Sequence, residues 1–233
     1  MSISDYRSAL IVGVGPGISA SLARHLSSMG MTLGLAARDI EKLKPLAEET
    51  GAKTFAADAA DAASVAGLFQ QVEGQIGPPD VVVYNAGSRG HGPIAELDPD
   101  AVEKALAVLA FGGFLVTQQA AKRMIPRGYG AILLTGATAS LKGFAGSAAF
   151  AMGKFALRGL AQSAARELGP KGIHVAHVVI DGVVRAEHRP DRPGSPDSTL
   201  EPGAIAQTYI DVLSQPRSAW SFEVELRPWT ETF

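Results

Sequence analysis

The residues best suited to chemistry lie in the second half of the chain. Phe150 and Lys154 stand four residues apart in an alanine-rich stretch, 147–162, whose apolar residues recur at helical intervals. Both side chains would therefore lie on one helix face. An apolar run ends shortly before this stretch and is followed by Thr138 and Ser140. A lysine ammonium can donate hydrogen bonds to sugar hydroxyls, and a serine or threonine hydroxyl can pass on a proton. The alternatives are a solvated lysine and hydroxyls that satisfy a turn.

Three glycines near the start of the chain predict a site for a phosphate-bearing ligand. Residues 8–14 form a short apolar run typical of a buried strand, which brings the chain to Gly13, Gly15 and Gly17. From Ile18 onward, apolar residues recur every four positions, which indicates a helix. Glycines let the backbone approach a pyrophosphate, and a helix N-terminus offers free N–H groups and a positive dipole end. This order favours a dinucleotide site, with a tight turn that binds no ligand as the alternative.

The residues after the second predicted strand, 32–36, bear on the choice of dinucleotide. A carboxylate at this place would hydrogen-bond a ribose hydroxyl, whereas a cation suits a 2′-phosphate. Arg38 occupies the place and favours NADP over NAD. Asp39 follows it and is either a ribose ligand or the cap of the next helix.

The tripeptide Asn85-Ala86-Gly87 follows a fourth apolar run at 80–84. Together with the glycine turn and the lysine of the later helix, it resembles the short-chain dehydrogenase/reductase family. The resemblance covers nearly the whole chain. It implies a Rossmann-type fold, a nicotinamide dinucleotide as cofactor, and contact between this tripeptide and the cofactor crevice.

The same resemblance implies roles for residues elsewhere. Asp58, which ends a third predicted strand at 52–57, would meet the adenine edge of the cofactor, with a turn or cap as an equal alternative. Lys154 would hydrogen-bond the nicotinamide ribose. In the family's glycine pattern, Val12 replaces a threonine and Ser19 replaces the last glycine.

Three positions depart from the family pattern, and all three serve proton transfer. Phe150 stands in place of the active-site tyrosine, Ala137 in place of the catalytic serine, and Leu109 in place of an asparagine that helps hold a relay water. Phenylalanine has no proton to give. A small local shift would let Thr138 or Ser140 act instead, and Thr138 is our first choice.

Alternating strand and helix patterns predict one α/β domain, residues 1–233, with a doubly wound parallel sheet of about seven strands. The remaining predicted strands and one long helix are at 131–135, 173–180 and 219–226, and at 101–124.

The polar segment at about 183–203 contains four prolines, which exclude a long helix. Its place between a strand and a helix favours a substrate lid. Arg185, His188 and Arg189 would be the lid groups that meet a substrate, with a solvated loop as the alternative.

These observations favour an atypical NADP(H)-dependent reductase. Hydride would pass to or from a carbonyl or an activated carbon–carbon double bond of a small-molecule substrate. The alternative is a catalytically silent dinucleotide-binding protein that acts as a sensor or a partner subunit, because the three altered positions serve proton transfer and none serves binding.

Composition excludes several other classes. The chain of 233 residues has a net charge of −2 and no basic stripe, which argues against nucleic-acid binding. It has no cysteine, so thiolate metal sites are excluded, and His174 and His177 would point to opposite faces of a strand, so we expect no metal. Short apolar runs and the lack of a signal-like start predict a cytoplasmic protein without a membrane span. The resemblance, with the alanine faces of the long helices, implies a homodimer or homotetramer.

Overall fold

The computed structural model describes residues 3–88 and 90–231, which form a seven-stranded sheet in the order β3-β2-β1-β4-β5-β6-β7. Every neighbouring pair is parallel. The strands are β1 (Ser8–Val12), β2 (Thr32–Ala37), β3 (Lys53–Ala56), β4 (Val81–Tyr84), β5 (Gly130–Thr135), β6 (Ile173–Ile180) and β7 (Glu223–Leu226). The prediction of an α/β doubly wound sheet is confirmed.

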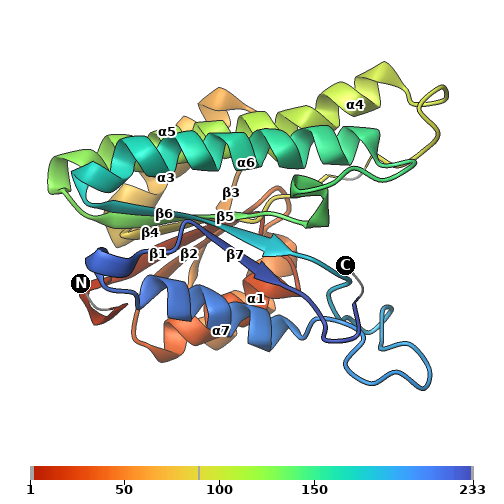
Figure 1. Cartoon of the computed structure of the whole chain (residues 1–233). Coiled ribbons are helices and arrows are strands. Elements are labelled where there is room, and N and C mark those ends of the chain that lie inside the picture. Colours follow the sequence, from red (N-terminus) through yellow and green to blue (C-terminus); the bar gives the residue numbers. More distant parts are fainter. Residues whose placement is uncertain (1–2, 89, 232–233) are drawn as a thin grey trace.

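Helices cover both faces of the sheet (Figure 1). The helices are α1 (Ile18–Ser28), α2 (Lys44–Thr50), α3 (Ala62–Ile76), α4 (Pro99–Leu106), α5 (Gly112–Met124), α6 (Ala148–Leu168) and α7 (Pro202–Leu213). Helices α1 and α7 lie on one face, and α3, α5 and α6 lie on the other. Because the sheet is covered twice, its central strands are apolar without alternation, and all residues of β1 and β6 are buried.

The predicted helix at 101–124 is not a single α-helix. It consists of α4 and α5, joined by a π-helical turn at Ala107–Phe111. The Tyr84 hydroxyl donates a hydrogen bond to the carbonyl of Val108 inside this turn. A side chain at Gly112 would collide with the same tyrosine. The wider turn therefore lets the helix pass close to the end of β4, and a π-turn often marks a functional region.

Two predicted strands are shorter than expected. The third covers Lys53–Ala56 rather than 52–57, which is within the usual uncertainty of strand ends. The seventh begins at Glu223 rather than at residue 219, because Arg217–Ala219 forms a 3₁₀ turn and the Trp220 ring stacks on His174 with 4.6 Å between ring centroids. Across the described residues, no helix has the length and apolarity needed to cross a membrane.

Candidate active site and cofactor cleft

The carboxyl ends of the central strands border a cleft of about 650 Å³. It lies where the strand order reverses, between β1 and β4, which is the usual ligand position in an open parallel sheet. Residues predicted to bind the cofactor line it, among them Gly13, Gly15, Arg38, Asp58, Ala86 and Gly87. The structure thus brings together residues from four separate segments of the chain.

The three glycines of the loop differ in the space around them. Gly13 has φ +88°, and a side chain there would lie 2.2 Å from the backbone nitrogen of Ala86. Its lack of a side chain is therefore required for the contact between the ends of β1 and β4. Gly15 has open space beside its Cα, and a Cβ on Gly17 would meet its nearest atom, on Val184, at 3.9 Å. These two glycines leave the loop backbone accessible from the cleft.

The start of α1 faces this loop. Gly17 precedes the helix without any side-chain cap, so the first N–H groups from Ile18 onward have no side-chain acceptor at that cap. Such a terminus favours an anion.

Asn85 is held by Ser19, which replaces the last glycine of the family's glycine pattern. Its Nδ2 donates to Ser19 Oγ at 2.7 Å, and Ser19 Oγ donates to the carbonyl of Gly13 at 3.2 Å. The buried Ser19 hydroxyl thus ties the carboxyl end of β4 to the glycine loop. The sequence contained one sign of this role, which is a serine at the start of a helix where the family pattern has glycine.

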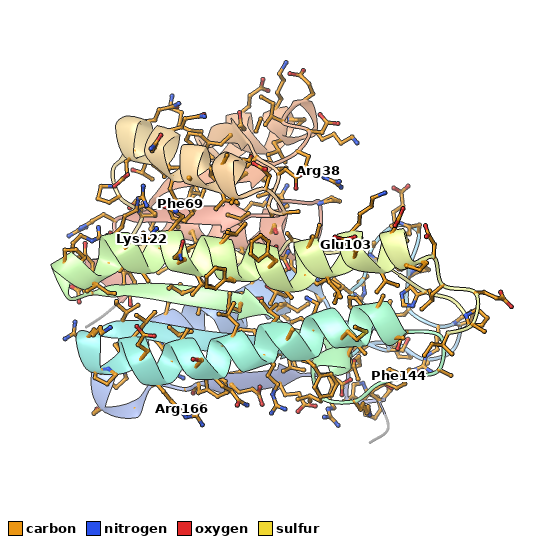
Figure 2. The ribbon with its side chains drawn as sticks, turned by 90° about the horizontal axis from the view of Figure 1, so that it is seen from above. Arg38, Phe69, Glu103, Lys122, Phe144 and Arg166 are labelled. Atoms are coloured by element: carbon orange, nitrogen blue, oxygen red, sulfur yellow. The ribbon has the colours of Figure 1, made fainter. Side chains whose placement is uncertain are left out.

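The two charged residues after β2, Arg38 and Asp39, have different roles. Asp39 accepts the backbone N–H of Glu41 at 3.2 Å and pairs with Lys42 at 3.2 Å, so it caps the next turn. Arg38 is exposed, and within the described chain no carboxylate forms an ion pair with it. Figure 2 shows Arg38 on the same side of the molecule as Glu103 of α4. Its guanidinium is therefore available at the cleft.

Asp58 lies at the cleft but also serves its own turn. Its Oδ1 accepts the N–H of Ala60 at 2.9 Å, and its backbone N–H donates to Ser64 Oγ at 2.9 Å. The side chain is exposed. The second carboxylate oxygen remains the group that a ligand in the cleft can use.

Lys154 on α6 is buried beneath the end of β5. Its side chain is 6% exposed, and its ammonium donates to the carbonyl of Thr135 at 2.7 Å. Burial lowers the pKa of Lys154 to about 8. The sequence pattern placed this lysine on the helix face of Phe150, and the Phe150 ring centroid is 5.8 Å from the ammonium. A solvated lysine is excluded.

Phe150 and Leu109 belong to one small apolar cluster between α4 and α6, with Ala105 and Ala149. Leu109 is fully buried, and a side chain at Gly153 would lie 2.5 Å from its Cβ. Two of the three positions that depart from the family's proton-transfer pattern, 109 and 150, therefore belong to an apolar cluster.

The hydroxyl candidates occupy a 3₁₀ turn, Thr138–Ser140, directly after Ala137. Thr138 is half-buried, whereas Ser140 is fully buried and its Oγ accepts the N–H of Ala137 at 3.1 Å. Thr135 is not available, since its hydroxyl contacts Tyr209 of α7 at 2.7 Å.

The sequence identified His177 as a strand histidine but did not predict its polar partners. His177 of β6 is fully buried, with Nδ1 2.9 Å from Glu223 of β7. Arg158 of α6 holds both oxygens of Glu223 at 2.7 Å. A histidine inside an apolar strand was the visible signal, but its partners come from elements 19 and 46 residues away.

The segment 183–203 folds back on itself around Asp191. This carboxylate pairs with Arg185 at 2.6 Å and accepts the N–H and hydroxyl of Thr199 at 2.9 and 2.6 Å. Hydrogen bonding to Thr199 and Arg185 lowers the pKa of Asp191 to about 2. Arg185, a predicted lid group, is thus engaged within the segment itself, whereas His188 is exposed.

Comparison with known proteins agrees with this geometry. The chain matches the family model of the short chain dehydrogenases over residues 7–193, and so belongs to that family of nicotinamide-dependent oxidoreductases. A D-threitol dehydrogenase of Mycolicibacterium smegmatis is 31% identical over 176 residues, which cover 73% of this chain and 68% of that protein.

Two solved structures are similar along nearly their whole length. A short-chain dehydrogenase from Rhodopseudomonas palustris has a TM-score of 0.83 and 36% identity, covering 96% of this chain and 99% of the other. A metagenomic short-chain oxidoreductase in complex with NADP has a TM-score of 0.84 and 30% identity, covering 95% and 97%.

We expect Gly13→Ala to destabilise the chain by at least about 2 kcal/mol, because it combines a positive φ with a backbone collision. Gly15→Ala is the matched control and should cost less than about 1 kcal/mol, since its Cβ enters open space. Urea unfolding followed by circular dichroism measures both. Equal losses in the two variants would contradict the assigned role of Gly13.

Lys154 should leave a signature in the pH dependence of stability. Below about pH 8 the lysine is charged in both folded and unfolded chains, so the cost of burying the charge is complete. Between pH 8 and its ordinary value of 10.5, the folded chain releases the proton that the unfolded chain keeps, so stability rises with pH. Relative to Lys154→Met, the wild type should gain up to about 3 kcal/mol across this window. Parallel pH curves for the two proteins would refute the buried ammonium.

Proposed function

We propose that this chain is an NADP(H)-dependent oxidoreductase that moves hydride between the nicotinamide and a carbonyl or activated double bond of a small molecule. The observation that carries this proposal is the cleft itself. Gly13, Gly15 and the available Arg38 line it, the uncapped start of α1 follows the same glycine loop, and the buried Lys154 lies outside the lining, at the end of β5. The similar metagenomic oxidoreductase in complex with NADP supports the choice of cofactor.

The residues present fit such a cofactor. The backbone from Gly15 to Ile18 would hold the pyrophosphate, because the space beside Gly15 is open and the start of α1 has no side-chain cap. Arg38 would pair with the 2′-phosphate, and Asp58 would meet the adenine edge. Lys154 would donate to the nicotinamide ribose. The bound nicotinamide would supply or accept the hydride, which none of these side chains can do.

Because Phe150 has no proton to donate, another group must deliver the proton. Thr138 and Ser140 are the hydroxyls that we propose for this role, because both lie in the turn that follows β5. Lys154 supports this turn indirectly, because its ammonium anchors the carbonyl at the end of the same strand. We assign the segment 183–203 as the cover of the substrate side, held in shape by Asp191.

One observation favours a second candidate function, a dinucleotide-binding protein without turnover. Leu109 and Phe150 form a packed apolar cluster where the family's relay would need polar groups. A cleft that binds the cofactor beside such a cluster would serve a sensor or a partner subunit equally well.

A homo-oligomer is also part of the proposal. Four large apolar side chains on and around the two long helices are about half exposed, namely Phe111, Phe114, Met152 and Phe155. The helices that carry them run side by side on one face of the molecule (Figure 2). Apolar surface of this extent is typical of a protein contact, and a second copy of the chain is the partner we propose.

The cofactor assignment is tested by titrating the protein with NADPH and NADH, following nicotinamide fluorescence. Arg38→Ala should raise the Kd for NADPH at least about tenfold, or about 1.4 kcal/mol, and leave NADH unchanged. Arg24→Ala is the matched control, because Arg24 also lines the cleft but is already bound to Glu49 at 2.7 Å. An equal loss for both nucleotides would remove the 2′-phosphate contact, and no binding of either would remove the proposed function.

Phe150→Tyr separates the two candidate functions. If the site lacks nothing but its acid, the tyrosine should create NADPH-dependent reduction of simple aldehydes and ketones where the wild type has none. Phe155→Tyr, five residues further on the same helix and 44% exposed, should create none. Turnover by the wild type supports the enzyme, whereas activity confined to Phe150→Tyr supports the silent binder.

A further inference from the structure

The junction between α4 and α5 has an unusual backbone register. In a regular α-helix the N–H of Gly112 would donate to the carbonyl of Val108. Here it donates instead to the carbonyl of Ala107, one residue further back, so the chain makes the π-turn Ala107–Phe111. Such turns are rare, and they are frequent at functional sites. A contact from outside the helix that favours this register is therefore of functional interest.

The Tyr84 phenol supplies that contact. Tyr84 is the last residue of β4 and is fully buried, and its hydroxyl donates to the carbonyl of Val108. This is the carbonyl that gives up the N–H of Gly112 in the π-turn. Burial, and after it the negative charge of Asp58, raises the pKa of Tyr84, so the phenol keeps its proton and remains a donor at neutral pH. The hydrogen bond thus favours the π register over the α register.

Close packing holds the phenol in this position. A Cβ on Gly112 would collide with the Tyr84 hydroxyl and would lie 2.6 Å from the carbonyl oxygen of Ala59. The helix can approach the end of β4 this closely because Gly112 has no side chain. The start of α5, the phenol and the segment after β3 are therefore in direct contact.

This contact borders the cofactor cleft. Val108, whose carbonyl the phenol binds, lines the cleft together with Ala57, Asp58 and Ala59. Three of these four residues are apolar, and Asp58 is an exposed carboxylate. An apolar wall suits the face of an aromatic base, and a carboxylate can accept a hydrogen bond from an amino group at its edge.

The register of the helix decides whether Val108 reaches this wall. One residue corresponds to about 100° of rotation in an α-helix, because a turn takes about 3.6 residues. If the junction returned to the α register, α4 would rotate by about this angle relative to α5. Val108 would then turn away from the cleft.

We propose that Tyr84 is a positioning residue for the dinucleotide, because its hydroxyl holds the π-turn and the π-turn holds Val108 against the adenine base. The inference rests on the proposed function and deepens it, since it assigns one wall of the adenine site to a helix junction. Tyr84 is buried and does not touch the ligand, so its effect passes through Val108.

The first test is calorimetric titration with NADPH and with adenosine 2′,5′-bisphosphate, which is the adenine half of that cofactor. Tyr84→Phe removes only the hydroxyl and should raise both Kd values by about threefold to tenfold, the range set by one hydrogen bond. Tyr209→Phe is the matched control and should change neither value. Tyr209 is also fully buried, and its hydroxyl contacts Thr135 at 2.7 Å on the other face of the sheet. Unchanged values in Tyr84→Phe, or an equal rise in Tyr209→Phe, overturn the proposal.

A double-mutant cycle tests whether the effect passes through Val108. Val108→Ala keeps the carbonyl that accepts the phenol but removes two methyl groups from the wall, so the Kd for NADPH should rise about threefold or more. Adding Tyr84→Phe to Val108→Ala should then raise the Kd by a smaller factor than it does in the wild type. Equal factors in the two backgrounds overturn the coupling.

Amide hydrogen exchange of the nucleotide-free protein tests the π-turn separately. In Tyr84→Phe, the amides from Ala107 to Gly112 should exchange about threefold or more faster than in the wild type, and in Tyr209→Phe they should not change. An unchanged rate in Tyr84→Phe overturns the inference and leaves the proposed function intact. A wild type that binds neither nucleotide overturns both.

Discussion

The close approach of β1 and β4 at their carboxyl ends is the constraint on which the site depends. Gly13 can lie against the backbone of Ala86 because it has no side chain. Ser19 then connects Asn85 with the Gly13 carbonyl, so the glycine loop, the start of α1 and the end of β4 form one unit. The reversal of strand order at this point opens the cleft, and the same contact fixes its floor.

Polar groups are buried at high cost on the other side of the cleft. Lys154 and His177 lie beneath the turn after β5, and each is held by a single partner, the Thr135 carbonyl and the Glu223 carboxylate respectively. Such groups are destabilising unless they are satisfied, and they are expected where function requires a group with a perturbed pKa. Their burial by α6, β5, β6 and β7 gathers ionisable groups with a lowered pKa at the β5–β6 side of the sheet.

The region between α4 and α6 is apolar, in contrast to the buried polar groups beneath the end of β5. There the family pattern would place polar groups, but Leu109 and Phe150 pack in hydrocarbon, and the π-turn brings Leu109 against Gly153 of α6. The chain thus combines a cleft at the ends of β1 and β4 with an apolar cluster between α4 and α6 and buried polar groups beneath the end of β5. Two ionisable side chains border this cluster, because the His91 ring lies 6.0 Å from that of Phe150 and the Lys154 ammonium lies 5.8 Å from the same ring.

The sequence determined the fold class, the order of the strands along the chain and six of the ten predicted cofactor positions that line the cleft, because apolar runs, glycine turns and helical periodicity are local patterns. It also determined the loss of the phenol at Phe150. The partners of Ser19, the turn role of Asp39, the π-turn and the buried triad of Arg158, Glu223 and His177 were decided by the tertiary structure alone. The physical reason is that these contacts join segments far apart in the chain, where the pairing depends on strand register and helix packing rather than on any local pattern.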